Sequence, residues 1–509
     1  MSLIALCGMA LTIGSCANDD VAQNPTIPND DKNLTTFAAG TPTTRTSMES
    51  DGKFFWEQGD KIYVKDDNGA WHASSNSPTG KTDKFKFKVP GTYTAHTSYE
   101  VYYPGQGGSN DQAVIAASQS QAEPNTTTHF GAAGDCGMAT ATKVPGKQQF
   151  AFTLDHKAAY LLFLPRTSNT ILHDCYLTKV EVNSDDDITD TYTLDPVTGK
   201  LTGTGTGKQI TLTTGGSGTY TNGFPLTNNA TSAATNGAYM VIKPGTHTLK
   251  IRYWVKDIAT NVEGTITKIL SSKNFEQNKY YNITANLDAR DYDGDHYYMW
   301  DAQEQYWKGY EWTKHLPGNT GQPTVDGGAS SNYAQGNTDP RFCNEFYPGS
   351  GISYSATHTP CKDLPNANEL TWYADKGDPH WDGDEVWTTM GHLYKGGMWF
   401  KKKAYISGYN TNTAYDGTDW RQLNENRVSW SSVPTTPPDA ADANKYFYLP
   451  AFGFYRQGGL GSICDYGFYW SSTGGGASSF AYALEFAYGY IRVNFSNPRY
   501  HGYRVDGFE

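Results

Sequence analysis

The chain has 509 residues, of which 18% are charged and 14% aromatic, and its formal net charge at pH 7 is −12. The negative charge excludes a protein that binds nucleic acid by electrostatics, because phosphate contacts require clustered Lys and Arg. The 36 Tyr and 53 Gly exclude an aromatic-poor disordered chain and are typical of short strands joined by glycine turns. This length predicts about three domains rather than one core.

An apolar run at residues 3–13 opens the chain. It is shorter than the roughly 20 residues of a membrane-spanning helix and has the length of a signal-peptide core. The run leads into Gly14-Ser15-Cys16, an order that resembles the bacterial lipobox. The resemblance implies a signal peptide over 1–15, lipid attachment at Cys16 and export as an outer-membrane lipoprotein precursor. The alternative is a cytosolic N-terminus with a chance cysteine.

A polar, proline-containing stretch at residues 16–33 predicts a lipidated, flexible tether. Beyond it, short segments of alternating or clustered apolar residues are separated by Gly- and Thr-rich turns, which predicts half-buried strands. The predicted strands are 61–64, 84–89, 99–103, 150–154, 159–164, 176–182, 239–242 and 248–254. Because few long segments have helical periodicity, we expect an all-β part made of two sandwiches, over 34–165 and 166–288.

Two segments of this part resemble Bacteroidota fimbrillin-like proteins, the subunits of type V pili. Thr44-Arg45-Thr46 followed by residues 55–64 is similar to the opening of these proteins, and residues 280–287 are similar to the strand that closes their second sandwich. The resemblance implies that both sandwiches are transthyretin-like, with Greek-key connections.

The same resemblance implies assembly by exchange of a β-strand. In similar proteins an arginine-specific protease removes the N-terminal strand, and a strand of the next pilus subunit fills the groove. Arg45 would be the processing site, and residues 34–39 would be the strand that leaves. Judged from the residues alone, Arg45 is equally consistent with a solvent-facing position on the first strand.

Composition changes after Leu287, and tryptophan becomes frequent. Expected short helices near 299–312 and 366–373 make this part α+β. Its last quarter resembles a Bacteroidota surface-domain family related to C-type lectins. The motifs that carry this resemblance are 448–453, 467–473, 482–486 and 502–505. The resemblance implies a C-type-lectin-like domain over 296–509, so the predicted fold class is mainly β, with two tandem sandwiches followed by this domain.

A subunit that both accepts and donates a strand needs a free donor segment, whereas this sequence closes with a lectin-like domain. That order favours a pilus tip adhesin, which accepts a strand and binds a host or bacterial glycan or protein. The alternative is a monomeric outer-membrane lipoprotein that captures glycans without polymerising, in which case Cys16 would be a permanent anchor.

No enzyme motif stands out, since GxSxG, P-loop and HExxH patterns are missing from the sequence. We therefore expect no enzyme, no cofactor and no metal. A run that starts like a calcium loop at Asp291 has His296 where that loop requires glycine. The acidic pair around Gly383 is expected to be a solvated turn rather than a catalytic pair.

Sugar binding requires flat aromatic faces beside carboxylates or amides. Two predicted loops, 378–384 and 409–420, supply both kinds of group. The candidate ligand-binding residues are Asp378, His380, Trp381, Asp382, Asp384, Asn410, Asn412, Asp419 and Trp420. The alternative is packing beneath long loops, and Trp470 is expected in the core.

Five cysteines remain once the signal residues and Cys16 are set aside. Export permits disulfides, and the odd number leaves at least one thiol unpaired within the chain. Cys343 and Cys361 flank a Gly/Ser-rich loop and are the predicted pair.

Overall fold

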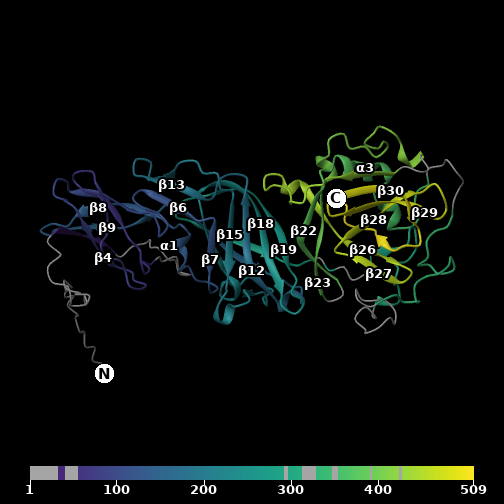
Figure 1. Cartoon of the computed structure of the whole chain (residues 1–509), viewed down its shortest axis with the longest axis horizontal. Coiled ribbons are helices and arrows are strands. Elements are labelled where there is room, and N and C mark those ends of the chain that lie inside the picture. Colours follow the sequence, from purple (N-terminus) through teal and green to yellow (C-terminus); the bar gives the residue numbers. More distant parts are fainter. Residues whose placement is uncertain are drawn as a thin grey trace, which may run out of the picture.

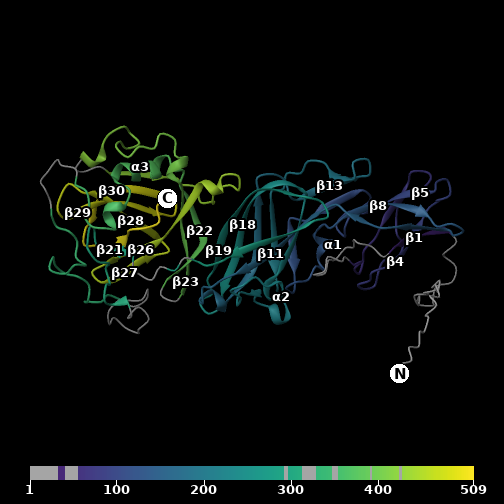
Figure 2. The ribbon, with the colours of Figure 1, turned by 180° about the vertical axis from the view of Figure 1, so that it is seen from behind.

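Three β-rich regions follow one another along an elongated molecule (Figures 1 and 2). The computed structural model describes residues 33–40, 55–289, 291, 296–311, 328–346, 354–389, 392–422 and 427–509. Cys16 and Arg45 therefore lie outside the described residues. Across these ranges, no helix has both the length and the apolar character needed to cross a membrane.

The N-terminal region is a curled sheet with the strand order β3-β2-β5-β8-β9-β1-β4, and β10 pairs with β8. The bounds are β1 Leu34–Ala39, β2 Tyr63–Lys65, β3 Trp71–Ala73, β4 Phe85–Pro90, β5 Ser98–Tyr103, β8 Gly137–Lys143, β9 Gln149–Phe152 and β10 Asp155–His156. The alternating pattern of β4 puts Phe87 and Val89 on the inner face, where both are fully buried. They pack with Trp56 and other aromatic side chains in one core.

The middle region packs two sheets face to face. The core between them contains Phe163, Val180, Met240 and Tyr253, all fully buried. One sheet has the order β17-β11-β20, and the other contains β19-β18-β12-β15-β7. The bounds are β7 Ser118–Gln121, β11 Ala159–Arg166, β12 Cys175–Ser184, β15 Gln209–Thr214, β17 Ala238–Ile242, β18 Gly245–Asp257, β19 Glu263–Phe275 and β20 Tyr280–Asn286.

Strand pairing runs across residue 165, the expected boundary between the two sandwiches. β7 pairs with β15, and β6 (Gln112–Ile115) pairs with β13 (Asp190–Asp195). β11 pairs with β17 and β20. These three strands begin before residue 165 but are hydrogen-bonded to later strands, so they belong to the sheets of the middle region.

The C-terminal region combines a large sheet with a short helix and a hairpin (Figure 1). The sheet order is β21-β31-β28-β29-β30-β24, and the hairpin β22-β23 extends to β25. The bounds are β21 Tyr297–Tyr298, β22 His380–Thr389, β23 His392–Lys401, β24 Arg427–Ser431, β25 Tyr446–Pro450, β28 Tyr466–Gly474, β29 Phe480–Ala487, β30 Tyr490–Pro498 and β31 Tyr503–Arg504. Trp470 on β28 is fully buried, which confirms its expected place in the core.

One of the two expected helices forms. Helix α3 (Ala367–Asp375) begins with a capping box between Asn366 and Glu369, which satisfies free N–H groups of its first turn. The helix expected near 299–312 is wrong over its described residues, which form turns. Asp301 there has a φ of 58°, in the left-handed region that interrupts a right-handed helix.

The predicted disulfide between Cys343 and Cys361 is also wrong. Both thiols are free and buried, and they lie in different hydrophobic clusters. The sulfur of Cys361 accepts a hydrogen bond from the Asp301 backbone N–H at 3.2 Å. Burial raises the pKa of both thiols to about 12, so they act as small apolar side chains.

The prediction of a mainly β chain with several sheets and few helices is confirmed. Every strand predicted from the apolar patterns is also present. The finer description, transthyretin-like sandwiches followed by a C-type-lectin-like domain, stays a prediction.

Candidate functional site

Strand β1 lies inside the N-terminal sheet rather than at its edge. It pairs with β4 in antiparallel fashion over its whole length and with β9 in parallel fashion over Thr36–Ala39. Phe37 is opposite Phe87 on β4 and Phe150 on β9. The N-terminal segment expected to leave is therefore bonded along both of its edges.

The side chains of β1 alternate between the core and the outer face. Thr35, Phe37 and Ala39 are 4%, 0% and 7% exposed, while the residues between them are partly exposed. The Phe37 ring stacks on Phe150 and meets Tyr93 edge-on, each with 5.2 Å between ring centroids. No residue of β1 is charged, so the strand is held by backbone hydrogen bonds and one large apolar side chain.

Strand β4, on the outer side of β1, has a second attachment. The Ser75 N–H donates to the Lys88 carbonyl at 2.7 Å. The Asn76 amide donates to Lys86 O at 2.9 Å and accepts from Lys88 N at 2.7 Å. Because these bonds hold β4 from the other edge, removal of β1 would leave a slot with a strand edge on each side and the Phe37 cavity between them.

Four of the five candidates of the first set, His380, Trp381, Asp382 and Asp384, lie in a strand, so the expectation of a loop is wrong for them. Asp382 and Glu385 are buried, so the expected solvated turn is wrong for these two carboxylates. These residues belong to β22, whose pairing with β23 shifts register between Asp382 and Val386. Asp382 is only 2% exposed. It accepts from Arg252 Nη2 at 3.0 Å and from Trp399 Nε1 at 3.1 Å. The partner that stabilises its charge comes from β18, 130 positions earlier in the sequence.

Glu385 completes this junction between the middle and C-terminal regions. Its carboxylate accepts from Thr265 Oγ1 at 3.0 Å, Thr267 N at 2.8 Å and Thr267 Oγ1 at 2.6 Å. Desolvation and the neighbouring charge of Asp382 raise its pKa above the usual value. We call Arg252, Thr265, Thr267, Asp382 and Glu385 the seam.

A glycine allows the two strands of the seam to approach. Thr265 on β19 pairs with Glu385 on β22 in the parallel sense. A Cβ added to Gly264 would lie 2.4 Å from the Asp384 carbonyl oxygen and 2.5 Å from Val386 Cγ1. Any larger residue at this position must push β19 and β22 apart.

The other members of the first set surround the same hairpin. The Asp378 carboxylate accepts from Lys401 Nζ at 3.0 Å and from the Tyr446 hydroxyl at 2.5 Å. His380 Nδ1 lies 2.8 Å from the Thr436 carbonyl, to which it donates. Asp384 pairs with Lys395 at 3.2 Å, and Trp381 is only 7% exposed. These contacts give each residue a structural role in the hairpin.

Three members of the second set, Asn410, Asn412 and Asp419, lie in a loop, as expected, while Trp420 begins a short 3-10 helix (Trp420–Gln422). Asn410 and Asn412 are exposed, and the Asn410 side chain accepts from the Asn412 N–H at 2.7 Å. Asp419 forms an ion pair with Arg421 at 2.8 Å, and the hydrogen bond from Arg421 lowers the pKa of Asp419 to about 2. Trp420 is 1% exposed and packs in the core. Among the described residues, no hydrogen bond or ion pair joins the two candidate sets.

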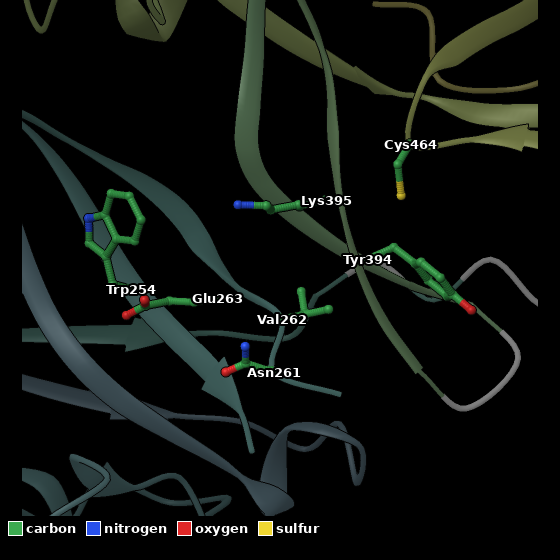
Figure 3. A pocket seen from close by; sticks show the side chains of 7 residues that line it. All are labelled: Trp254, Asn261, Val262, Glu263, Tyr394, Lys395 and Cys464. Carbon is green, nitrogen blue, oxygen red and sulfur yellow. The ribbon is translucent and has the colours of Figure 1, made fainter. Parts of the chain in front are cut away.

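A pocket of about 470 Å³ opens beside the seam (Figure 3). Its walls come from both regions that the seam joins. The lining residues are Trp254 on β18, Asn261, Val262 and Glu263 around the β18–β19 turn, Tyr394 and Lys395 on β23, and Cys464 before β28. Sequence reasoning missed this pocket because its two walls are more than a hundred residues apart and carry no joint motif. Within the described ranges, no group of His, Cys, Asp and Glu side chains could hold a metal ion.

Comparisons with known proteins give structural likenesses alone. No family model and no curated protein matches the sequence. The similar solved structures include a candidate cell adhesion protein from Bacteroides uniformis, with 17% identity, 51% of this chain and 94% of that chain covered, and a TM-score of 0.29. A candidate cell adhesion protein from Bacteroides ovatus has 16% identity, 46% and 84% coverage, and a TM-score of 0.28. A fimbrial protein from Bacteroides ovatus has 10% identity, 92% and 98% coverage, and a TM-score of 0.26. With identities and TM-scores this low, the matches do not establish a shared function.

Proposed function

We propose that this chain is a fimbrial subunit of the bacterial cell surface, placed at the pilus tip, where it accepts a donor strand and adheres through its C-terminal region. It is not an enzyme in this proposal. Its partners are other pilus subunits and a glycan or protein on a host or bacterial surface, and lipid on Cys16 carries the precursor to the outer membrane.

The place of β1 in the N-terminal sheet is the observation that carries the proposal. A strand bonded on both edges, with one deeply buried aromatic side chain and no charge, can be replaced by another strand of the same pattern. Its loss would expose unpaired backbone groups and the Phe37 cavity together. Such a gap favours capture of a new strand, because both the backbone and the apolar face would otherwise meet water.

The packing of β31 bears on whether this segment could serve as a donor strand. Arg504 on β31 is fully buried, pairs with Asp506 at 2.8 Å and lies over the Tyr297 and Phe452 rings. Val505 is 4% exposed. These residues are part of their own core, so this segment is not free to act as a donor strand.

Cleavage tests the assembly half of the proposal. The precursor is incubated with an Arg-specific protease, and the new N-terminus is sequenced. We expect one dominant product that begins at Thr46, and no such product from the Arg45→Gln variant. Cuts at many sites, or none near Arg45, would contradict processing at this position.

The second candidate is a monomeric, lipid-anchored glycan-capture protein. The complete pairing of β1 favours it, since a chain that keeps this strand needs no partner to close its sheet. Sheared pili distinguish the two: the chain is found in the pilus fraction if it is a tip subunit and only in the membrane fraction if it is a permanent monomer.

A further inference from the structure

We propose that the pocket beside the seam binds an uncharged pyranose unit of a glycan, held by groups from both the middle and the C-terminal regions. The inference rests on the adhesive half of the proposed function and is independent of strand exchange, because no residue of β1 contributes to the pocket. Its volume of about 470 Å³ lies within the range of about 300–1,000 Å³ that is typical of small-molecule sites.

The middle-region wall includes one aromatic side chain, Trp254, which has a cation over one face of its ring. Trp254 is partly exposed on β18, between Lys179 on β12 and Thr265 on β19. The Lys179 ammonium lies 3.9 Å from the indole centroid. A cation on the ring restrains the orientation of the indole. Val262 adds an apolar side chain to the same wall, which suits the C–H face of a sugar ring.

Polar groups on this wall are free to bind hydroxyls. The Glu263 carboxylate accepts one hydrogen bond, from Thr178 Oγ1 at 2.6 Å, which fixes it and leaves its other oxygen without a partner among the described residues. Asn261, at the tip of the turn with a φ of 58°, is exposed and its side-chain amide makes no hydrogen bond within the same set. In Figure 3 the Asn261 side chain lies next to Val262, and the Glu263 side chain lies next to Trp254.

The opposite wall supplies one cation. Lys395 extends from β23 toward the side of the pocket that holds Trp254 (Figure 3). Its ammonium is bound to Asp384 at 3.2 Å, and its side chain is 41% exposed. One carboxylate and one ammonium give the lining no net charge, so an anionic ligand gains little over a neutral one. An apolar face, an amide and a fixed carboxylate favour a hydroxylated, uncharged ring instead.

Binding is tested on the full chain with four probes: lactose, methyl α-mannoside, N,N′-diacetylchitobiose and the anionic sialyllactose. Isothermal titration and saturation-transfer NMR report affinity and contact. We expect at least one neutral sugar to bind, with affinity reduced about tenfold or more in Glu263→Gln and in Asn261→Gly, because the first replaces a charged acceptor oxygen by an amide N–H donor and the second removes the side-chain amide. Glycine at 261 keeps the left-handed turn, so this variant should fold.

The matched control is Asn278→Gly, which changes another asparagine of left-handed φ, 57°, in a turn outside the pocket. It should leave the affinity unchanged. The inference is overturned if none of the neutral sugars binds, if sialyllactose alone binds, or if the two pocket variants bind as well as the native chain. None of these results depends on strand exchange. Each of the two proposals can therefore be contradicted without the other.

Discussion

The β1 slot and the seam both join a strand to a neighbouring sheet, but by opposite means. Phe37 and backbone hydrogen bonds hold β1, without a charge. At the seam, Thr265 and Glu385 form the single backbone pair, and buried ionic and hydroxyl contacts surround it. Apolar burial is non-directional and would tolerate a related strand in the slot, whereas the seam requires its own partners at fixed distances. The contrast fits an exchangeable N-terminal strand and a permanently joined C-terminal region.

Truncation of the buried aromatic in β1 should have the largest effect. Phe37→Ala removes a ring that contacts Phe150 and Tyr93 and leaves a cavity, at an expected cost of about 4 kcal/mol. Hydrogen exchange of β4 and β9 measures it. Thr36→Ala, on the outer face of the same strand, is the control and should cost less than about 1 kcal/mol. Equal effects of the two changes would show that the buried side chain of Phe37 is not what holds β1 in the sheet.

Removal of the Arg252 cation from the seam should lower the free energy of its opening by about 3 kcal/mol. Arg252→Met leaves the Asp382 charge buried without its partner. The readout is local opening of β19 and β22 by hydrogen exchange. The double variant with Asp382→Leu should recover most of the loss, since neither charge then remains. If the double variant is as unstable as the single one, the ion pair between Arg252 and Asp382 is not the main contribution to the stability of the seam.

Adding a methyl group at Gly264, where β19 and β22 approach closely, should lower the free energy of unfolding by about 2 kcal/mol. Gly264→Ala would place its Cβ against the Asp384 carbonyl and force the strands apart. Thermal unfolding and exchange at β22 report the effect. Gly461→Ala is the matched control, because a Cβ there has no heavy atom within 4 Å. If both variants unfold at the same temperature, the close approach of β19 and β22 at residue 264 does not determine the stability of the seam.

The pH dependence of the seam is the smallest expected effect and has a definite sign. The folded-state pKa of Glu385 is raised above its usual value near 4.5 by desolvation and by Asp382, so the folded protein binds more protons than the unfolded chain just above that pH. The contribution of this group to stability is therefore greatest below its usual pKa and is lost as pH rises through the raised value. Glu385→Gln should flatten this part of the profile of unfolding free energy against pH, while an unchanged slope would assign it to other groups.

The strands were predictable because their periodicity is local. The pattern of residues 84–89 alone indicates β4, and α3 is predicted near its observed place. The role of residues 380–385 was not predictable. An Asp-Gly-Asp-Glu run usually indicates a solvated turn, and it forms a buried, bulged strand here because Arg252, Thr265 and Thr267 satisfy its charges from distant positions. The pocket was missed for the same reason, since tertiary contact alone brings Glu263 and Lys395 to it.

Strand replacement is the most direct test of the central claim. After Arg-specific cleavage, the protein is mixed with an excess of a labelled peptide of residues 33–40, and incorporation is followed by native mass spectrometry and by hydrogen exchange of β4 and β9. A second peptide, with aspartate in place of Phe37, is the control. The account predicts that the first peptide replaces β1 and protects both neighbouring strands while the second does not. Retention of the original strand with no uptake of peptide, or equal uptake of both peptides, would contradict it.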